Sequence, residues 1–135
     1  MAKKSKVTHT SGKRKRAVAR ATLKPGTGKI KINNRALEIW GTQLLRLRIK
    51  EPLILSGKHA SAFDFRITVR GGGVTGQADA IRLAIGRALV DIDSKLKNVL
   101  ADYDRTLLVA DVRRKEAGKP NSHGKARAKR QKSYR

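Results

Sequence analysis

The chain has 135 residues, which allows one domain with a modest core and flanking tails. It carries 33 Lys and Arg against 10 Asp and Glu, a formal net charge of +23, and a compact domain of that charge repels itself unless a polyanion is nearby. Nucleic acid is the first candidate and an anionic membrane surface is the second. The lack of Cys excludes disulfides and thiolate metal sites.

Neither a membrane segment nor an active site is expected. The N-terminal sequence MAKKSKVTHT has no apolar stretch of the kind that a signal peptide requires, and later apolar runs are too short for a transmembrane helix. His9, His59 and His123 lie in three separate segments, and no Ser, His and Asp spacing suggests a catalytic triad. We therefore expect no enzymatic activity, no metal, no cofactor, no small-molecule substrate and no membrane partner.

The positive charge is concentrated at the two ends of the chain. Residues 1–20 hold eight basic residues and no acid, and residues 113–135 hold ten basic residues and one acid, Glu116. Solvated tails are the ordinary explanation of such runs, but two of them on one small domain favour contact with RNA or DNA. We predict a basic extension over 1–10, a globular domain over 11–112 and an extended basic tail over 113–135.

The first predicted elements form a β-hairpin. Apolar and polar residues alternate over 17–23, a turn signal follows at Pro25–Gly28, and Ile30 and Ile32 alternate with lysines in a second strand. The basic run Lys13–Arg16 precedes the first of these strands. Five of the eight residues from Lys13 to Arg20 are basic, which is more than the protection of a sheet edge requires.

A helical region and a further strand follow. Residues 36–56 are predicted to be helical, with Thr42 as N-cap, Pro52 as a break that opens a second short helix, and Gly57 as its end. Apolar and polar residues then alternate from Phe63 to Arg70, which predicts a strand.

The strongest helix signal covers residues 76–90, where apolar residues recur at helical spacing along one face. A shorter helix is expected over 94–100, with Ser94 as its cap, and residues 106–111 fit either a strand or a helix. The predicted class is α+β, with helices packed on one face of a small, mostly antiparallel sheet. The general rule for strand–helix–strand crossovers predicts a right-handed connection.

Residues 71–76, Gly-Gly-Gly-Val-Thr-Gly, match the spacing of a dinucleotide fingerprint between a strand and a helix. We interpret the match as fortuitous, because only about twenty core residues follow Asp91 and a dinucleotide fold needs several more strand–helix units. Two explanations remain open and nearly equal. The glycines permit a tight turn, or their bare backbone N–H groups at the helix start bind a phosphate of RNA.

Three stretches of the sequence resemble one known family. Ser11 to Arg35 (SGKRKRAVARATLKPGTGKIKINNR) resembles the opening of small-subunit ribosomal protein family nine, and Gly71 to Leu89 (GGGVTGQADAIRLAIGRAL) resembles its central signature. The ending Gln-Lys-Ser-Tyr-Arg resembles the archaeal and eukaryotic form of that family. The resemblance covers the chain from about Thr10 to Arg135.

The resemblance implies a fold, a location and partners. The fold is the left-handed βαβ variety of the second domain of ribosomal protein five, a hand opposite to the general rule. The location is the cytoplasm, in the head of the small ribosomal subunit, where the partners are small-subunit rRNA and neighbouring head proteins. In this family the C-terminal tail reaches tRNA in the peptidyl site, so a role in translation without catalysis is implied.

The charge pattern and the resemblance together predict the binding residues. The basic and glycine-rich positions expected to bind rRNA are Lys13, Arg14, Lys15, Arg16, Arg20, Arg70, Gly71, Gly72, Gly73, Gln77, Arg113, Arg114, Lys125, Arg127, Lys129 and Arg130. The four tail residues that the resemblance places against tRNA are Lys132, Ser133, Tyr134 and Arg135. The alternatives are a nucleotide-dependent enzyme that uses residues 71–76 and a free basic protein that coats nucleic acid or an anionic membrane.

Overall fold

The structure is a computed structural model and describes residues 6–127. Its strands are β1 (Thr8–Arg14), β2 (Ala17–Pro25), β3 (Ile30–Ile32), β4 (Arg35–Ala36) and β5 (Phe63–Arg70). Its α-helices are α1 (Gln43–Ser56), α2 (Lys58–Ala62), α3 (Val74–Ile92) and α4 (Leu96–Tyr103), with 3₁₀ turns η1 (Leu37–Ile39) and η2 (Arg105–Leu107).

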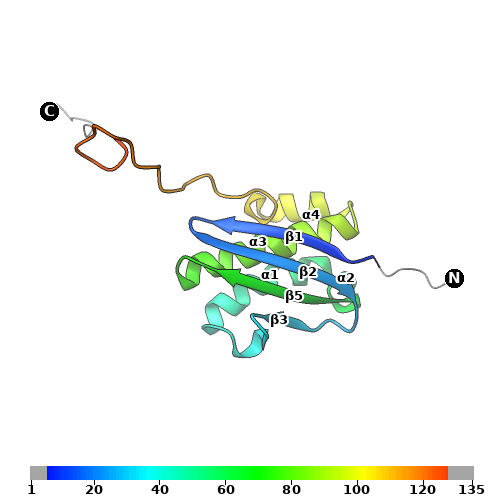
Figure 1. Ribbon diagram of the computed structural model, residues 1–135. Helices are drawn as coiled ribbons and strands as arrows, with labels where there is room; N and C mark the ends of the chain where they lie inside the picture. The colour runs from blue at the N-terminus through cyan, green and yellow to red at the C-terminus, as the bar shows by residue number, and fades with distance from the viewer. Residues whose placement is uncertain (1–5, 128–135) are drawn as a thin grey trace.

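One mixed sheet contains the five strands described within residues 6–127, in the order β1-β2-β5-β3-β4. The pairings β1–β2, β2–β5 and β3–β4 are antiparallel, whereas β3 and β5 are parallel. The hairpin predicted from residues 17–23 and the strand at Ile30 and Ile32 is therefore wrong, because β5 lies between β2 and β3 in the sheet. Figure 1 shows the helices on one side of the sheet, which leaves the other face of the sheet uncovered. The predicted α+β class is therefore confirmed.

The crossover from β3 to β5 is left-handed. In Figure 1 the helices lie behind the sheet, β5 points to the left, and the parallel strand β3 lies below it. The right-handed connection expected from the general rule is therefore wrong here, and the hand is the one that the family resemblance implies. The rule concerns a strand that feeds directly into its crossover helix. Here the chain first reverses in β4 and η1 before it enters α1.

The core is aliphatic and lies between the sheet and the helices. Three of the four inward residues of β2 are small, Ala17, Ala19 and Ala21, so that α3 packs close to the sheet. The inward residues of β5 and the apolar stripe of α3 add Phe65, Ile67, Val69, Ile81, Ala84, Ile85, Ala88 and Leu89 to the core. The helical spacing predicted for residues 76–90 is confirmed, since α3 spans and exceeds them.

The interpretation of Pro52 as a break is wrong, because α1 continues through it to Ser56. Pro52, Leu53 and Ser56 are all buried, so packing of this turn against the core outweighs the loss of one backbone hydrogen bond. The helix ends before Gly57, whose φ of +57° is left-handed, as predicted for this position.

Ser94 is not the cap of the following helix. The helix α4 begins at Leu96, and its N-cap position is Lys95, whose side chain cannot accept a hydrogen bond from the backbone. The carboxylate of Asp93 accepts a bond from the backbone N–H of Lys95 (3.0 Å) and stabilises the turn instead. The ambiguous residues 106–111 form no strand, and their start belongs to η2.

Strand β1, which the sequence pattern does not predict, pairs with β2 along its whole length from Thr8 to Arg14. The strand begins inside the range 1–10 that was expected to be an extension. It has no alternating apolar residues, and its buried position is Gly12, where the backbone of α3 at Ala80 and Ala84 leaves no room for a Cβ atom. Because a buried glycine carries no hydrophobic signal, the strand cannot be recognised from periodicity.

Candidate nucleic-acid interface

The β1–β2 turn and the glycine-rich β5–α3 turn lie against each other. Gly71 and Gly72 have φ of +78° and +65°, values that glycine adopts without strain. A Cβ atom at Gly71 would lie 2.6 Å from the carbonyl oxygen of Arg16, and one at Gly72 would lie 2.9 Å from the backbone nitrogen of Ala17. The tight-turn explanation is therefore confirmed for these two glycines.

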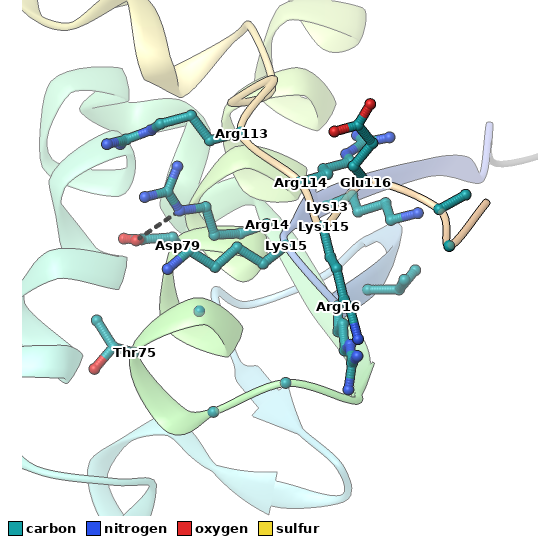
Figure 2. A pocket seen from close by; sticks show the side chains of 16 residues that line it. Lys13, Arg14, Lys15, Arg16, Thr75, Asp79, Arg113, Arg114, Lys115 and Glu116 are labelled. Atoms are coloured by element: carbon teal, nitrogen blue, oxygen red, sulfur yellow. Dashed lines mark ion pairs between the residues drawn. The ribbon is translucent and has the colours of Figure 1, made fainter. Parts of the chain in front are cut away.

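This packing creates a concavity of about 1380 Å³, which we call the basic groove. Figure 2 shows basic side chains of the β1–β2 hairpin and of residues 113–115 around one opening, with Thr75 and Asp79 of α3 at its side. The groove is lined by Lys13, Arg14, Lys15, Arg16, Val18, Gly72, Gly73, Thr75, Gly76, Asp79, Arg113, Arg114, Lys115, Glu116, Ala117 and Gly118. Cations that are a hundred residues apart in the chain thus face the same space.

One predicted cation in the groove is balanced inside the protein. Arg14 forms ion pairs with Asp111 and with Asp79 (Nε to Oδ2, 3.8 Å), and Asp79 also pairs with Arg48 (3.2 Å). Arg113 likewise pairs with Asp111 (2.7 Å), although its own side chain is exposed. The placement of Arg14 therefore indicates a structural role, because its guanidinium lies between two carboxylates, which it shares with Arg48 and Arg113.

The other cations of the groove have no such partner. Lys13, Lys15, Arg16, Arg114 and Lys115 are exposed, and none makes an ion pair within residues 6–127. Their side chains face solvent close to one another, so their like charges repel. An external polyanion is the arrangement that relieves this repulsion.

The acid Glu116 does not neutralise the groove. Its carboxylate accepts hydrogen bonds from Arg127 (3.0 Å) and Lys119 (3.3 Å), and these two contacts, Arg127 first, lower the pKa of Glu116 from its ordinary value. The charge of Glu116 is thus taken up by cations of its own C-terminal segment. Residues 113–127 form neither helix nor strand and lead away from the sheet (Figure 1).

Several predicted residues lie outside the groove. Arg20 and Arg70 are on the uncovered face of the sheet, where they line a second depression of about 960 Å³ that also includes Arg16 and Gly71. The side chain of Gln77 donates to the carbonyl oxygen of Gly71 (3.1 Å) and so supports the turn. The remaining predicted positions with described structure are Lys125 and Arg127, which are exposed beyond the groove. The predictions for Lys129, Arg130, Lys132, Ser133, Tyr134 and Arg135 lie outside the described residues.

Sequence reasoning missed Lys115 and Thr75, which line the groove. Lys115 directly follows Arg113 and Arg114 and could have been included from the charge run alone. Thr75 carries no signal in the sequence, because its position depends on how α3 begins beside the hairpin. None of the helices in residues 6–127 has the length and apolar character that crossing a bilayer requires.

Comparison with known proteins identifies the family. Residues 12–135 match the family described as Ribosomal protein S9/S16. The chain belongs to this family. The protein called Small ribosomal subunit protein uS9 from Methanococcus maripaludis (strain C5) is 50% identical over 133 residues, which cover 96% of this chain and 99% of the relative. The protein of the same name from Thermoplasma acidophilum is 52% identical over 128 residues, covering 93% and 98%.

Membership settles the class of protein. The resemblance found in the sequence is confirmed, and the chain is a structural protein of the ribosome in the cytoplasm rather than an enzyme. The fingerprint-like glycine run therefore serves this fold and not a nucleotide-dependent reaction. The relatives with high identity include archaeal ones, as the tail sequence indicated.

Proposed function

We propose that this chain is a structural constituent of the small ribosomal subunit that binds rRNA of the subunit head through its basic groove. The observation that carries the proposal is the convergence of Lys13, Lys15, Arg16, Arg114 and Lys115 on one concavity without a carboxylate partner among the described residues. Curated relatives covered almost completely by this chain are called small ribosomal subunit proteins. Neighbouring head proteins are the further partners that this location provides.

Binding in the groove rests on phosphate contacts. Arg16 and Arg114 offer forked donors that match two phosphate oxygens, and Lys13, Lys15 and Lys115 act as point charges. The helix α3 begins at the rim of the groove, and its first backbone N–H groups carry the positive end of the helix dipole toward an anion. Such contacts fix position and orientation on RNA without reading its sequence.

The fold of the body is proposed to be that of the second domain of ribosomal protein five. The left-handed crossover from β3 to β5 supports this likeness, because such a hand is rare among parallel strand connections (Figure 1). The remaining features, a mixed sheet with helices on one face, are shared by many α+β domains and carry less weight.

The C-terminal segment is proposed to act apart from the body. Residues 113–127 are exposed apart from Ser122 and Ala126, which are half-buried, and they start at the groove. We propose that the chain continues as an extended tail whose residues Lys132, Ser133, Tyr134 and Arg135 contact the backbone of tRNA in the peptidyl site. Contacts of this kind hold tRNA in place by charge and hydrogen bonds and do not read its sequence.

Titration of the purified chain with a head-domain rRNA fragment over a range of salt tests the groove. Phosphate contacts numbering about 6–10 would lose roughly 10³–10⁵ in affinity between 50 and 200 mM salt. The variant Lys15→Gln/Arg16→Gln should lower the salt slope by about 2 and leave the unfolding midpoint in urea unchanged. The matched control, Lys95→Gln/Lys97→Gln, removes two exposed charges outside both depressions described above.

The groove proposal fails if the two double variants bind equally well, or if wild-type affinity hardly changes with salt. A nonspecific coating protein is distinguished by co-sedimentation with small subunits at high salt, where a coat dissociates and an assembled constituent remains.

Deletion of residues 132–135 tests the tail. We expect small subunits that contain the truncated chain to assemble normally but to release tRNA from the peptidyl site faster, because the lost cations contact only tRNA. Sucrose-gradient profiles measure assembly, and filter binding measures tRNA retention. Blocked assembly with unchanged tRNA retention would show that the tail binds rRNA instead.

A further inference from the structure

The uncovered face of the sheet is a second cationic surface. Its outward residues, from four neighbouring strands, are His9, Ser11 and Lys13 of β1, Val18, Arg20, Thr22 and Lys24 of β2, Lys31 of β3, and Asp64, Arg66, Thr68 and Arg70 of β5. The acid among them, Asp64, accepts hydrogen bonds from the backbone N–H groups of Thr27 (2.8 Å) and Lys29 (2.9 Å). The carboxylate of Asp64 thus binds the backbone between β2 and β3, although it lies opposite Lys24 and two positions from Arg66 along β5.

The strand register arranges cations and hydroxyl groups in alternation. Arg20 lies between Ser11 on β1 and Thr68 on β5, and in the next row Thr22 lies beside Arg66. Cross-strand neighbours on one face are about 5 Å apart and diagonal neighbours about 7–8 Å. Arg20 and Arg66 therefore each have a hydroxyl group beside them, an arrangement that suits binding of a phosphate together with an adjacent sugar hydroxyl, whereas Arg70 lies opposite Val18.

One pair on this face is unfavourable in the isolated protein. Lys31 and Arg66 lie directly opposite each other in the parallel β3–β5 pairing, and both are exposed. Like charges in opposed positions destabilise a sheet. The guanidinium of Arg66 contacts the side-chain oxygen of Asn34 (3.2 Å) but no carboxylate within residues 6–127. An external anion above this pair would remove the repulsion.

The face lacks the large aromatic residues of a single-strand platform. No Phe, Tyr or Trp stands among its outward residues, and such aromatic side chains are the surfaces on which single-stranded bases stack. Double-stranded RNA is instead recognised through phosphates and 2′-hydroxyls across its wide minor groove. Exposed arginines alternating with Ser and Thr on a broad surface suit that kind of recognition.

We infer that the uncovered sheet face is a binding site for the backbone of an A-form RNA duplex, distinct from the part of the basic groove that is lined by Lys15, Arg114 and Lys115. The inference rests on the proposed function, because it divides RNA binding between two surfaces. The sheet face selects paired RNA by shape and 2′-hydroxyls, and the groove contributes affinity for any RNA strand. Arg66, Lys31, Thr22 and Thr68 become binding residues that no motif in the sequence indicates.

The test uses the full chain and three probes of equal phosphate number: an RNA duplex, an unstructured single-stranded RNA and a DNA duplex. Fluorescence anisotropy gives the affinity for each probe over a range of salt. The wild-type chain should bind the RNA duplex several-fold more tightly than either other probe. The variant Arg20→Gln/Arg66→Gln should lose this preference, bind the RNA duplex about tenfold more weakly or worse, and show a salt slope lower by about 2.

The groove variant Lys15→Gln/Lys115→Gln, whose two positions line only the groove, should weaken binding of all three probes and keep the preference for the RNA duplex. Circular dichroism and urea unfolding establish that both variants fold, and Lys95→Gln/Lys97→Gln controls for loss of charge. Equal wild-type affinity for paired and unpaired RNA overturns the inference, and so does a preference that survives in Arg20→Gln/Arg66→Gln. A groove variant that behaves like the control overturns the proposed function alone.

Discussion

The protein contains two groups of cations with opposite surroundings. Arg82 on α3 is 8% exposed and lies among acceptors from three elements: its guanidinium bonds to Glu51 of α1, to Asp104 (3.0 Å) and to the hydroxyl of Thr106 (3.0 Å). Arg16 in the basic groove is exposed and has no carboxylate partner among the described residues. The same residue type therefore joins helices in one place and faces outward in the other.

Structural and RNA-binding arginines therefore differ in whether carboxylates lie beside them. A buried guanidinium has to be paired, because an unpaired charge in the interior costs several kcal/mol. An exposed cation has no such requirement, and a group of them without acids is stable only at a modest cost in repulsion. A cation that the fold places beside carboxylates has a structural role, and an exposed cation without a carboxylate neighbour is available to RNA.

The largest effect expected from this comparison is loss of stability in Arg82→Met. Removing one partner of a buried ion pair costs about 3–5 kcal/mol. The side chains of Glu51 and Asp104 remain 32% and 37% exposed, so water compensates part of the loss and we expect about 2 kcal/mol. Urea unfolding measures the change, and RNA affinity of the folded variant should stay at the wild-type value. A loss under about 0.5 kcal/mol would show that the cluster does not stabilise the fold.

A sharper contrast comes from two neighbouring cations of the groove. Arg14→Gln should destabilise the protein by about 1 kcal/mol, because Asp111 and Asp79 lose the guanidinium that they share and keep only the exposed Arg113 and Arg48 as partners. Lys15→Gln should change stability by less than about 0.5 kcal/mol but should weaken RNA binding and its salt dependence. The same urea and anisotropy measurements on both variants decide the matter. If both variants lose RNA affinity equally, ion pairing does not prevent Arg14 from binding RNA.

The smallest expected effect is on the stability of the protein at low pH. Burial raises the pKa of Asp104, but hydrogen bonds from Thr106 and Arg82 outweigh it, so the pKa lies below its ordinary value. A carboxylate with a lowered pKa contributes stability that is complete above the unfolded-state value near 4 and is lost as the pH falls through the folded-state value. Asp104→Asn should therefore reduce the decline of the urea midpoint below pH 4. A variant whose midpoint declines as steeply with acid as that of the wild-type chain would contradict this assignment.

Part of the fold could be predicted because its signals are local. The apolar stripe of α3 and the alternation of β5 depend on residues within one element, and both elements were placed within a few residues of their ends. Strand β1 could not be predicted, because its inward position is Gly12, which faces helix backbone rather than apolar side chains. The helix break predicted at Pro52 was wrong for a similar reason. The lost backbone hydrogen bond is a local cost, but the packing that outweighs it comes from the rest of the core.

Composition and periodicity alone indicate a need for a polyanion, an aliphatic core and basic residues gathered at both ends of the chain. They do so because neither depends on how the chain folds. Which cations remain without partners depends on the tertiary structure. Arg14 and Lys15 are adjacent and look alike in the sequence, yet Arg14 meets Asp79 and Asp111 from distant elements. Ion pairing is decided by distances of a few ångströms across the fold, and such distances are set only when the strands and helices pack.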